Sequence, residues 1–325
     1  MPHKSSQILK NLLSDISPIL KRTDINEIIL DEPGIAKLDL GNETWEYINS
    51  KVITQAFLEN FPKQLATWSN QKFDEKTINL STAIPGTYNR VNVIHKSILR
   101  SIHDCNTINI RIQKPTKFHL ESFLKSEIPD SYKEAGNPTY NKNDSFEAKI
   151  KAIMDKEENV LISGGTNSGK TSLFNALIEF ININYRVVTI EDSPELNIPH
   201  RNKTQLLISK SGSNISQTTY KEATDISTRI RPTVLLVGEL DTNNTSTFLR
   251  LGNTGHKGMI ATLHANTPVD AITALESNLG HTKNPISLKA MHNLMRSGVD
   301  HIIQMYHHQI VEIMPMKELL KENQL

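Results

Sequence analysis

The chain has 325 residues, which is long enough for two domains that each bury a core. Its 36 Lys and Arg residues nearly balance its 35 Asp and Glu residues, and this balance argues against broad, charge-driven binding to nucleic acid. The single cysteine, Cys105, excludes a disulfide within one chain and favours a cytosolic setting. No apolar run approaches the about 20 residues that a membrane-spanning helix needs, and the N-terminus lacks the pattern of a secretion signal.

The first part of the chain mixes short helical and strand-like segments. Residues 5–20 carry apolar side chains at helical spacing, which predicts a helix packed on its own domain. The alternative, a helix that docks on a membrane or a partner, is disfavoured because its polar face carries few cations. Residues 26–40, "RVNVIHKSIL" and "TINIRIQKP" predict strands, and residues 51–69 predict a helix that Pro62 kinks or breaks. We therefore expect a smaller α+β domain over residues 1–137.

The stretch "PTYNKNDS", residues 138–145, is polar and predicts a linker. From residue 146 onward, helical segments alternate with runs rich in Val, Ile and Leu. These runs are "NVLISGG", "YRVVTIED", "QLLIS", "TVLLVGEL" and "GMIATLHA". Continuous apolar strands separated by helices predict a mostly parallel sheet covered on both faces. The stretch "HIIQMYHHQIVEIM" predicts a late hairpin, so residues 146–325 are expected to form one α/β domain.

A glycine-bracketed loop follows the first of these strands. It reads Gly164-Gly165-Thr166-Asn167-Ser168-Gly169-Lys170-Thr171, then Ser172, and fits the pattern G-x-x-x-x-G-K-[ST]. Glycines let the backbone N–H groups turn toward phosphate oxygens, and the helix that follows adds its positive end. Lys170 can bridge the β- and γ-phosphates, and the Thr171 hydroxyl can bind Mg²⁺. The loop therefore predicts nucleotide binding.

Three later stretches carry acidic residues or histidines. "VVTIEDSPEL" ends a strand with Glu191 and Asp192, which would face a ligand crevice or form a solvated turn. "RPTVLLVGEL" ends with Glu239, our leading candidate to polarise the attacking water or to complete the Mg²⁺ shell. "GNTGHKGMIATLHANTP" holds His256 and His264, which can donate to a phosphate or to a catalytic carboxylate. Taken singly, each histidine is equally explained as a polar residue near a turn.

Taken together, these stretches resemble a known family, the RecA-like secretion ATPases that power type IV secretion, type II secretion and type IV pili. The four matching stretches are "GGTNSGKT", "TIEDSPEL", "RPTVLLVGEL" and "NTGHKGMIATLHANTP". They follow the family's order over residues 159–268. The resemblance implies a RecA-like motor domain that hydrolyses ATP with Mg²⁺. It also implies a homohexameric ring, peripheral to the cytoplasmic face of the inner membrane, that works with secretion-channel proteins and a coupling ATPase.

The resemblance also implies roles for individual residues. Arg90 and Arg111 would reach the phosphates from the N-terminal domain, and Arg229 and Arg231 would contact phosphate or a neighbouring subunit. The catalytic set would be Glu239, Glu191, His264 and His256, and the Mg²⁺ ligands would be Thr171, Glu191 and Glu239. One departure stands out, because the family often continues Gly-Glu-x-Arg whereas this chain has Gly238-Glu239-Leu240-Asp241. The role of that arginine has no counterpart here.

Two features favour the type IV secretion branch of the family. A single cysteine excludes the four-cysteine zinc module that pilus-assembly and type II assembly ATPases usually carry. The stretches "TLHANTP" and "GHKG" are also more similar to that branch than to the pilus-retraction branch. A pilus-retraction-type motor remains the first alternative. A nucleotide-dependent scaffold or regulator with little turnover is the second, although such a protein would not need the Glu and His residues.

Overall fold

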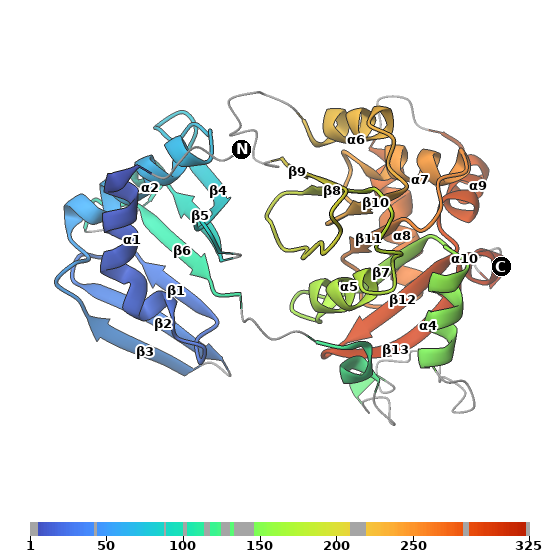
Figure 1. The fold of residues 1–325 in the computed structure, drawn as a ribbon, viewed down its shortest axis with the longest axis horizontal. Helices are drawn as coiled ribbons and strands as arrows, with labels where there is room; N and C mark the ends of the chain where they lie inside the picture. Colours follow the sequence, from blue (N-terminus) through green and yellow to red (C-terminus); the bar gives the residue numbers. More distant parts are fainter. Residues whose placement is uncertain are drawn as a thin grey trace. The chain divides into compact units, whose positions relative to one another are not determined.

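The computed structural model describes residues 6–41, 44–87, 89–99, 103–113, 118–124, 131–132, 146–208, 219–281 and 286–322. The chain divides into two compact units, and each is considered by itself (Figure 1). The first unit contains Met1–Thr116, Asp192–Pro194 and Leu207–Thr219. The second contains Lys117–Glu191, Glu195–Leu206 and Tyr220–Leu325. The two-part, α+β then α/β organisation expected from the sequence is confirmed.

In the described part of the first unit, six strands form an antiparallel sheet in the order β3-β2-β1-β6-β5-β4. The sequence indicated β1, β2, β5 and β6 but gave no clear sign of β3 or β4. Strand β3 lies at the edge of the sheet, and most of its side chains, apolar ones included, are exposed, so it has no buried apolar alternation. The strands are β1 (Glu27–Leu30), β2 (Ile35–Gly41), β3 (Thr44–Asn49), β4 (Asn79–Ala83), β5 (Arg90–Ile94) and β6 (Thr107–Arg111).

One face of this sheet is the core of the first unit. Side chains alternate along each inner strand, so Val91 and Val93 of β5 are buried whereas Arg90 and Asn92 face the other way. Two helices, α1 (Gln7–Leu20) and α2 (Gln55–Trp68), share a hydrophobic cluster with the buried strand residues. The packing of α1 on its own unit is therefore confirmed. The helix α2 continues through Pro62, so the predicted break at this proline is wrong.

In the described part of the second unit, seven strands form a sheet in the order β13-β12-β7-β11-β10-β8-β9. Each strand from β12 to β8 in this order is parallel to the next one, and β13 pairs with β12 in the antiparallel direction. The mostly parallel sheet and the late hairpin are thus confirmed. The strands are β7 (Val160–Gly164), β8 (Val187–Glu191), β9 (Lys203–Leu207), β10 (Val234–Val237), β11 (Ile260–Leu263), β12 (His301–Tyr306) and β13 (Gln309–Pro315).

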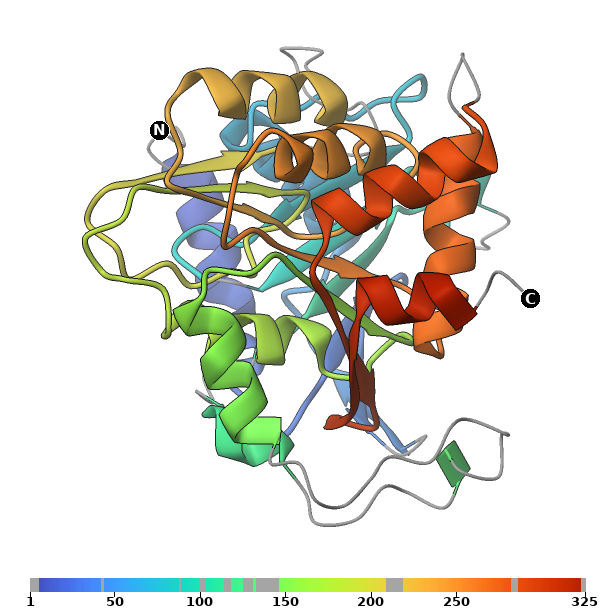
Figure 2. The ribbon, with the colours of Figure 1, turned by 90° about the vertical axis from the view of Figure 1, so that its right-hand side faces the viewer.

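Helices cover both faces of this sheet (Figure 2). On one face, α4 and α5 share a core cluster with inward residues such as Ile162 and Leu236. On the other, α7, α8 and α9 contact one another, and α8 contacts β12. The helices are α4 (Phe146–Asp155), α5 (Lys170–Ile178), α6 (Tyr220–Arg229), α7 (Thr245–Asn253), α8 (Pro268–Gly280), α9 (Leu288–Gly298) and α10 (Met316–Glu322). None of the helices in these described ranges combines the length and apolar character needed to cross a bilayer.

The division between the units falls earlier than the sequence suggested. It lies between Thr116 and Lys117, whereas the composition placed it at residue 137. The short 3-10 helix η2 (Leu120–Phe123) explains the difference, because Leu120 and Phe123 are buried in the core cluster of the second unit. Such a short segment has no periodicity from which its burial could be read. Residues 138–145 lie outside the described residues, so the linker stays a prediction.

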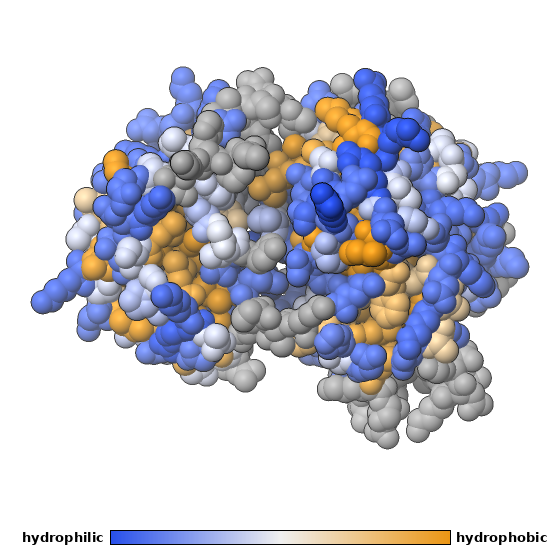
Figure 3. Space-filling view, viewed as in Figure 1, coloured by the Kyte–Doolittle hydropathy of each residue, from blue (hydrophilic) through white to orange (hydrophobic). Residues whose placement is uncertain are grey.

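The surface is largely hydrophilic in the view of Figure 3, with smaller apolar areas between the polar ones. The exposed large apolar residues include Trp45 and Tyr47 of β3 and Ile8 of α1. Single exposed apolar side chains of this kind are common in folded proteins.

Candidate nucleotide-binding site

The glycine-bracketed loop lies where the sequence placed it, between the buried strand β7 and the helix α5. Asn167 and Gly169 have φ angles of 59° and 95°, in the left-handed region, and Gly169 caps α5. A β-carbon on Gly164 would lie 2.3 Å from Ser168 Oγ, and one on Gly169 would lie 2.9 Å from His308 Nδ1. The path of the loop therefore requires glycine at both positions.

Lys170 is the buried cation of the loop, with only 8% of its surface exposed. Its Nζ donates to the carbonyl oxygens of Gly164 and Gly165, each at 2.7 Å, and lies 3.3 Å from His264 Nδ1. An ammonium has three N–H donors, so these contacts within the described residues can use all of them. Burial lowers the pKa of Lys170 to about 8, and the carboxylates of Glu239 and Glu195 oppose that shift.

Glu239 and His264 meet because their strands are neighbours. Glu239 follows β10 and His264 follows β11. Because these neighbouring strands are parallel, their C-terminal ends lie side by side. His264 Nε2 lies 3.2 Å from Glu239 Oε1. Since Nδ1 of the same ring faces the Lys170 ammonium, we assign the ring proton to Nε2, which then donates to the carboxylate. Three of the predicted residues thus form one continuous series of contacts.

The backbone that carries Glu239 is held from two sides. The Thr262 hydroxyl donates to the Gly238 carbonyl at 2.6 Å, and Asn244 Nδ2 donates to the Glu239 carbonyl at 2.8 Å. Asn244 is itself fully buried, and its Oδ1 accepts from the Asp241 N–H. The carboxylate therefore extends from a rigid turn, although the family's arginine is missing after it.

Glu191 is placed differently from the expectation. It is 3% exposed, and its Oε1 accepts the backbone N–H groups of Glu195 and Leu196 at 2.8 and 2.7 Å. The hydroxyl of Thr189 donates to its Oε2. Burial raises the pKa of Glu191 to about 7, against the opposing effect of these hydrogen bonds. Glu191 thus supports the turn that follows β8.

Glu195 is the residue that the sequence reasoning missed. Its Oε2 accepts a hydrogen bond from the Thr171 hydroxyl at 2.9 Å, so it reaches the predicted Mg²⁺ ligand that Glu191 does not contact. The backbone carbonyl of Glu195 also accepts from Asn175 Nδ2 at 3.0 Å. The only signal in the sequence was a third acidic residue, four positions after Glu191 and three after Asp192. Ser172 lies in the same first turn of α5 and is half-buried.

Three predicted residues lie at the N-terminal ends of the strands, opposite the ends where Glu239 and His264 lie. Arg229 ends α6 and Arg231 follows it, and both precede the start of β10. His256 precedes the start of β11, and its carbonyl accepts from Asn159 Nδ2 at 3.1 Å, next to the start of β7. Within one chain these residues do not join Lys170 and Glu239. Their contact with phosphate stays a prediction.

Arg90 and Arg111 lie in the first unit, and the structure brings them together. They are register partners on the neighbouring strands β5 and β6. Both point away from the core, because the residues beside them, Val91 and Ile110, are buried. Carboxylates lie beside both arginines: the Arg90 guanidinium is 3.5 Å from Asp192 Oδ2. Arg111 has Glu27 of β1 as its register partner on the other side of β6. Their contact with nucleotide phosphates also stays a prediction.

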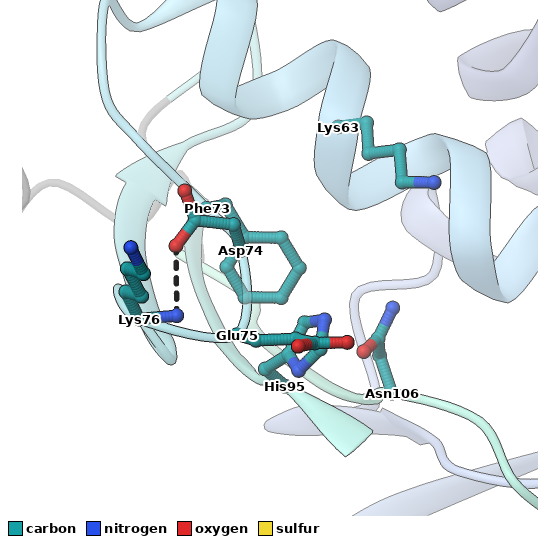
Figure 4. A pocket seen from close by; sticks show the side chains of 7 residues that line it. All are labelled: Lys63, Phe73, Asp74, Glu75, Lys76, His95 and Asn106. Atoms are coloured by element: carbon teal, nitrogen blue, oxygen red, sulfur yellow. Dashed lines mark hydrogen bonds between the residues drawn. The ribbon is translucent and has the colours of Figure 1, made fainter. Parts of the chain in front are cut away.

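A pocket of about 500 Å³ lies elsewhere, on the first unit (Figure 4). It is lined by Lys63, Phe73, Asp74, Glu75, Lys76, His95 and Asn106. None of the predicted site residues lines it, and Asp74 Oδ1 accepts the N–H of Lys76 beside it. Among the residues with described positions, no group of three or more His, Cys, Asp or Glu side chains is arranged to hold a metal ion. The chemistry therefore concentrates at the loop before α5.

Comparisons with known proteins agree with this site. The family model described as "Type II/IV secretion system protein" matches residues 87–312. The type IV secretion system protein VirB11 of Bartonella quintana is 27% identical over 328 residues, which cover 94% of this chain and 90% of that protein. The ATPase DotB of Legionella pneumophila has a TM-score of 0.60 at 18% identity, covering 93% of this chain and 77% of that chain. The pilus retraction motor PilT with bound ADP has the same TM-score and identity, covering 98% of this chain and 87% of that chain.

The two structural similarities show the fold alone, and that fold is the RecA-like one expected from the sequence. The family match extends over most of the chain and includes every one of the four stretches that the sequence analysis singled out. The chain therefore belongs to the family of type II/IV secretion system ATPases, which bind and hydrolyse nucleotide.

Proposed function

We propose that this chain is the ATP-hydrolysing motor of a type IV secretion system. The observation that supports this most is the series of contacts from Lys170 through His264 to Glu239, at 3.3 and 3.2 Å. This arrangement joins a phosphate-binding cation to a carboxylate able to activate water. The similarity to a VirB11 protein over nearly the whole chain favours type IV secretion. The fold is also similar to that of the pilus retraction motor PilT, so the fold by itself does not exclude a pilus-retraction motor.

ATP would bind through the loop and Lys170. The backbone N–H groups from Gly165 to Thr171 would surround the phosphates, and the N-terminus of α5 would add its partial positive charge. Phosphate oxygens would replace the carbonyl acceptors that now hold Lys170 Nζ. A phosphate raises the pKa of a neighbouring lysine, so bound ATP keeps Lys170 charged at neutral pH.

Mg²⁺ fits the oxygen groups beside the loop. The Thr171 hydroxyl and the Glu195 carboxylate already lie 2.9 Å apart, and hydroxyl and carboxylate oxygens are ligands that Mg²⁺ prefers. When bound, the ion would neutralise charge on the β- and γ-phosphates. We propose that Glu195 is the acidic residue on this side of the ion. Glu191 would act through Glu195, because it holds the backbone N–H of that residue.

Glu239 is proposed as the residue that polarises the attacking water. Its carboxylate is partly exposed and accepts from His264, which fixes its orientation. His264 also contacts Lys170, so the ring connects the proposed base to the cation that would contact the γ-phosphate. Hydrolysis would therefore depend on whether Lys170 holds a phosphate. A scaffold with little turnover would not need this connection.

We further propose a homohexameric ring, peripheral to the cytoplasmic face of the inner membrane. Its partners would be secretion-channel proteins and a coupling ATPase. Arg90 and Arg111 would supply positive charge to the phosphates. His256, Arg229 and Arg231 lie at the edge of the sheet away from Lys170, where a neighbouring subunit's nucleotide is the ligand that they could serve.

Phosphate release from ATP, with Mg²⁺ or with a chelator, tests the proposal. We expect turnover only with Mg²⁺, loss of turnover in Lys170→Ala, and unchanged turnover in Lys156→Ala, which removes an exposed lysine of the same unit. Native mass spectrometry with ATP and Mg²⁺ should show a particle of six chains. Equal turnover of Lys170→Ala and wild type would overturn the site. ATP binding without any phosphate release would favour the scaffold, and a strict monomer would overturn the ring.

A further inference from the structure

The turn of the β12–β13 hairpin touches the candidate phosphate loop. The backbone N–H of His308 donates to the Ser168 carbonyl at 3.0 Å. A β-carbon on Gly169 would lie 2.9 Å from His308 Nδ1 and 3.3 Å from its Cα. His308 therefore lies directly against the residue that precedes α5. This contact joins positions about 140 residues apart, and the sequence indicated only a hairpin in the stretch that contains His307 and His308.

The conformation of this turn is unusual for its sequence. Tyr306 and Gln309 are register partners, so His307 and His308 form a two-residue turn. Both have positive φ angles, 45° and 61°, as a type I′ turn requires. Asn-Gly or Asp-Gly is strongly preferred in such turns, because a β-carbon makes the left-handed region costly. Here two histidines adopt this costly conformation next to a candidate active site, and strained backbone is most often found at such sites.

The hairpin is anchored well enough to hold the loop. Gln304 of β12 is fully buried, and its Nε2 donates to the carbonyls of Ala265 and Asn266, which follow His264. The hydroxyl of the buried Tyr132 donates to Glu312 Oε2 of β13 at 3.2 Å. The hairpin thus contacts both the phosphate loop and the loop that carries His264. A rigid element in this place can restrict the motion of both.

We propose that His308 is a positioning residue for ATP binding. It holds the segment Ser168–Gly169 so that the N–H groups at the start of α5 face the phosphates. A glycine-rich loop has many backbone conformations. If only a fraction of the molecules hold the loop in the binding conformation, the apparent dissociation constant is the intrinsic one divided by that fraction. The inference rests on the proposed function, because it assumes that ATP is the ligand of this loop.

The test compares three variants in the full chain. His308→Gly removes the imidazole and keeps the N–H donor, and glycine accepts the left-handed conformation without cost. His307→Gly is the matched control, since its ring packs against Tyr306 at a centroid distance of 4.4 Å. His308→Asn is the conservative variant, because asparagine tolerates the left-handed region and carries a polar group near the position of Nδ1. Affinity is measured with a non-hydrolysable ATP analogue, alongside kcat and KM for ATP and the melting temperature.

We expect His308→Gly to raise the dissociation constant and KM on the order of tenfold, with kcat within about twofold of wild type. Its melting temperature should not fall, because glycine suits the turn. His307→Gly should bind the analogue as wild type does, and His308→Asn should recover most of the affinity. Equal affinities of His308→Gly and wild type would overturn the inference, as would equal losses in both glycine variants. If the wild-type protein binds the analogue but releases no phosphate from ATP, that result would contradict only the proposed ATPase motor.

Discussion

His264 Nε2 lies 3.2 Å from Glu239 Oε1, at the edge of the sheet where β10 and β11 end. The other nitrogen of the same ring lies 3.3 Å from the Lys170 ammonium. The imidazole therefore connects the group that would sense the γ-phosphate to the group that would activate water. In the proposed mechanism, such a connection would make water activation depend on a bound phosphate.

The first prediction concerns Glu239. Glu239→Gln should still bind ATP, because Lys170 and the loop are intact, but turnover should fall by about 10²-fold or more since the amide is a poor base. Glu276→Gln is a matched control, because Glu276 pairs with His292 at 2.6 Å between α8 and α9. That variant should turn over as wild type does. Phosphate release and analogue binding measure both effects, and normal turnover of Glu239→Gln would move the role of base to Glu195.

A second prediction follows from the buried Glu191. Its pKa is raised from 4.5 to about 7 in the folded protein, so the folded chain keeps a proton that the unfolded chain loses between these values. The stabilisation linked to that proton is complete below pH 4.5 and is lost as the pH rises through 7. A shift of this size corresponds to about 3 kcal/mol of unfolding free energy.

Glu191→Gln should remove this pH dependence. Urea unfolding from pH 5 to pH 8 should show the variant gaining stability relative to wild type as the pH rises, because only wild type must bury a charge. Glu318→Gln, which changes an exposed carboxylate of α10, should follow the wild-type curve. Parallel curves for Glu191→Gln and wild type would contradict the burial of a titrating carboxyl at this position.

The third prediction uses the opposed arginines of the first unit. Arg111→Ala should weaken ATP binding by roughly tenfold, since hydrogen bonds to charged groups contribute about 1.5–3 kcal/mol. Lys37→Ala is the control, since Lys37 is paired with Asp31 at 2.8 Å on β2. Unchanged ATP affinity in Arg111→Ala would count against a phosphate contact from this unit.

The fourth prediction concerns the close packing of α7 on α9. A β-carbon on Gly298 would lie 2.7 Å from the carbonyl oxygen of Leu249, and one on Gly252 would lie 2.6 Å from the backbone of Gly298. Backbone cannot move aside as a side chain can, so Gly298→Ala should destabilise the protein by about 1–3 kcal/mol. Gly280→Ala is the control, because no atom lies within 4 Å of its added β-carbon. Thermal unfolding compares the two, and equal melting temperatures would show that the helices can separate at little cost.

The sequence by itself determined the parts of this protein that depend on local pattern. Continuous apolar runs identified the buried strands β7, β8 and β10, and the glycine spacing placed the loop between β7 and α5. The order of the four stretches was enough to indicate the family, which the match over residues 87–312 shows. These features can be predicted from the sequence because strands, loops and helix starts are determined mainly by residues close together in the chain.

Only the tertiary structure decided which of the candidate residues meet. His256 and His264 are close in sequence, yet His256 precedes β11 and His264 follows it. The strand therefore holds them at its opposite ends. Glu195 rather than Glu191 contacts Thr171, because Glu191 turns inward to the backbone of its own turn. His308 reaches Gly169 through strand order, since β12 lies beside β7. Contacts of this kind depend on the order and register of strands that are distant in sequence, and no local pattern carries that information.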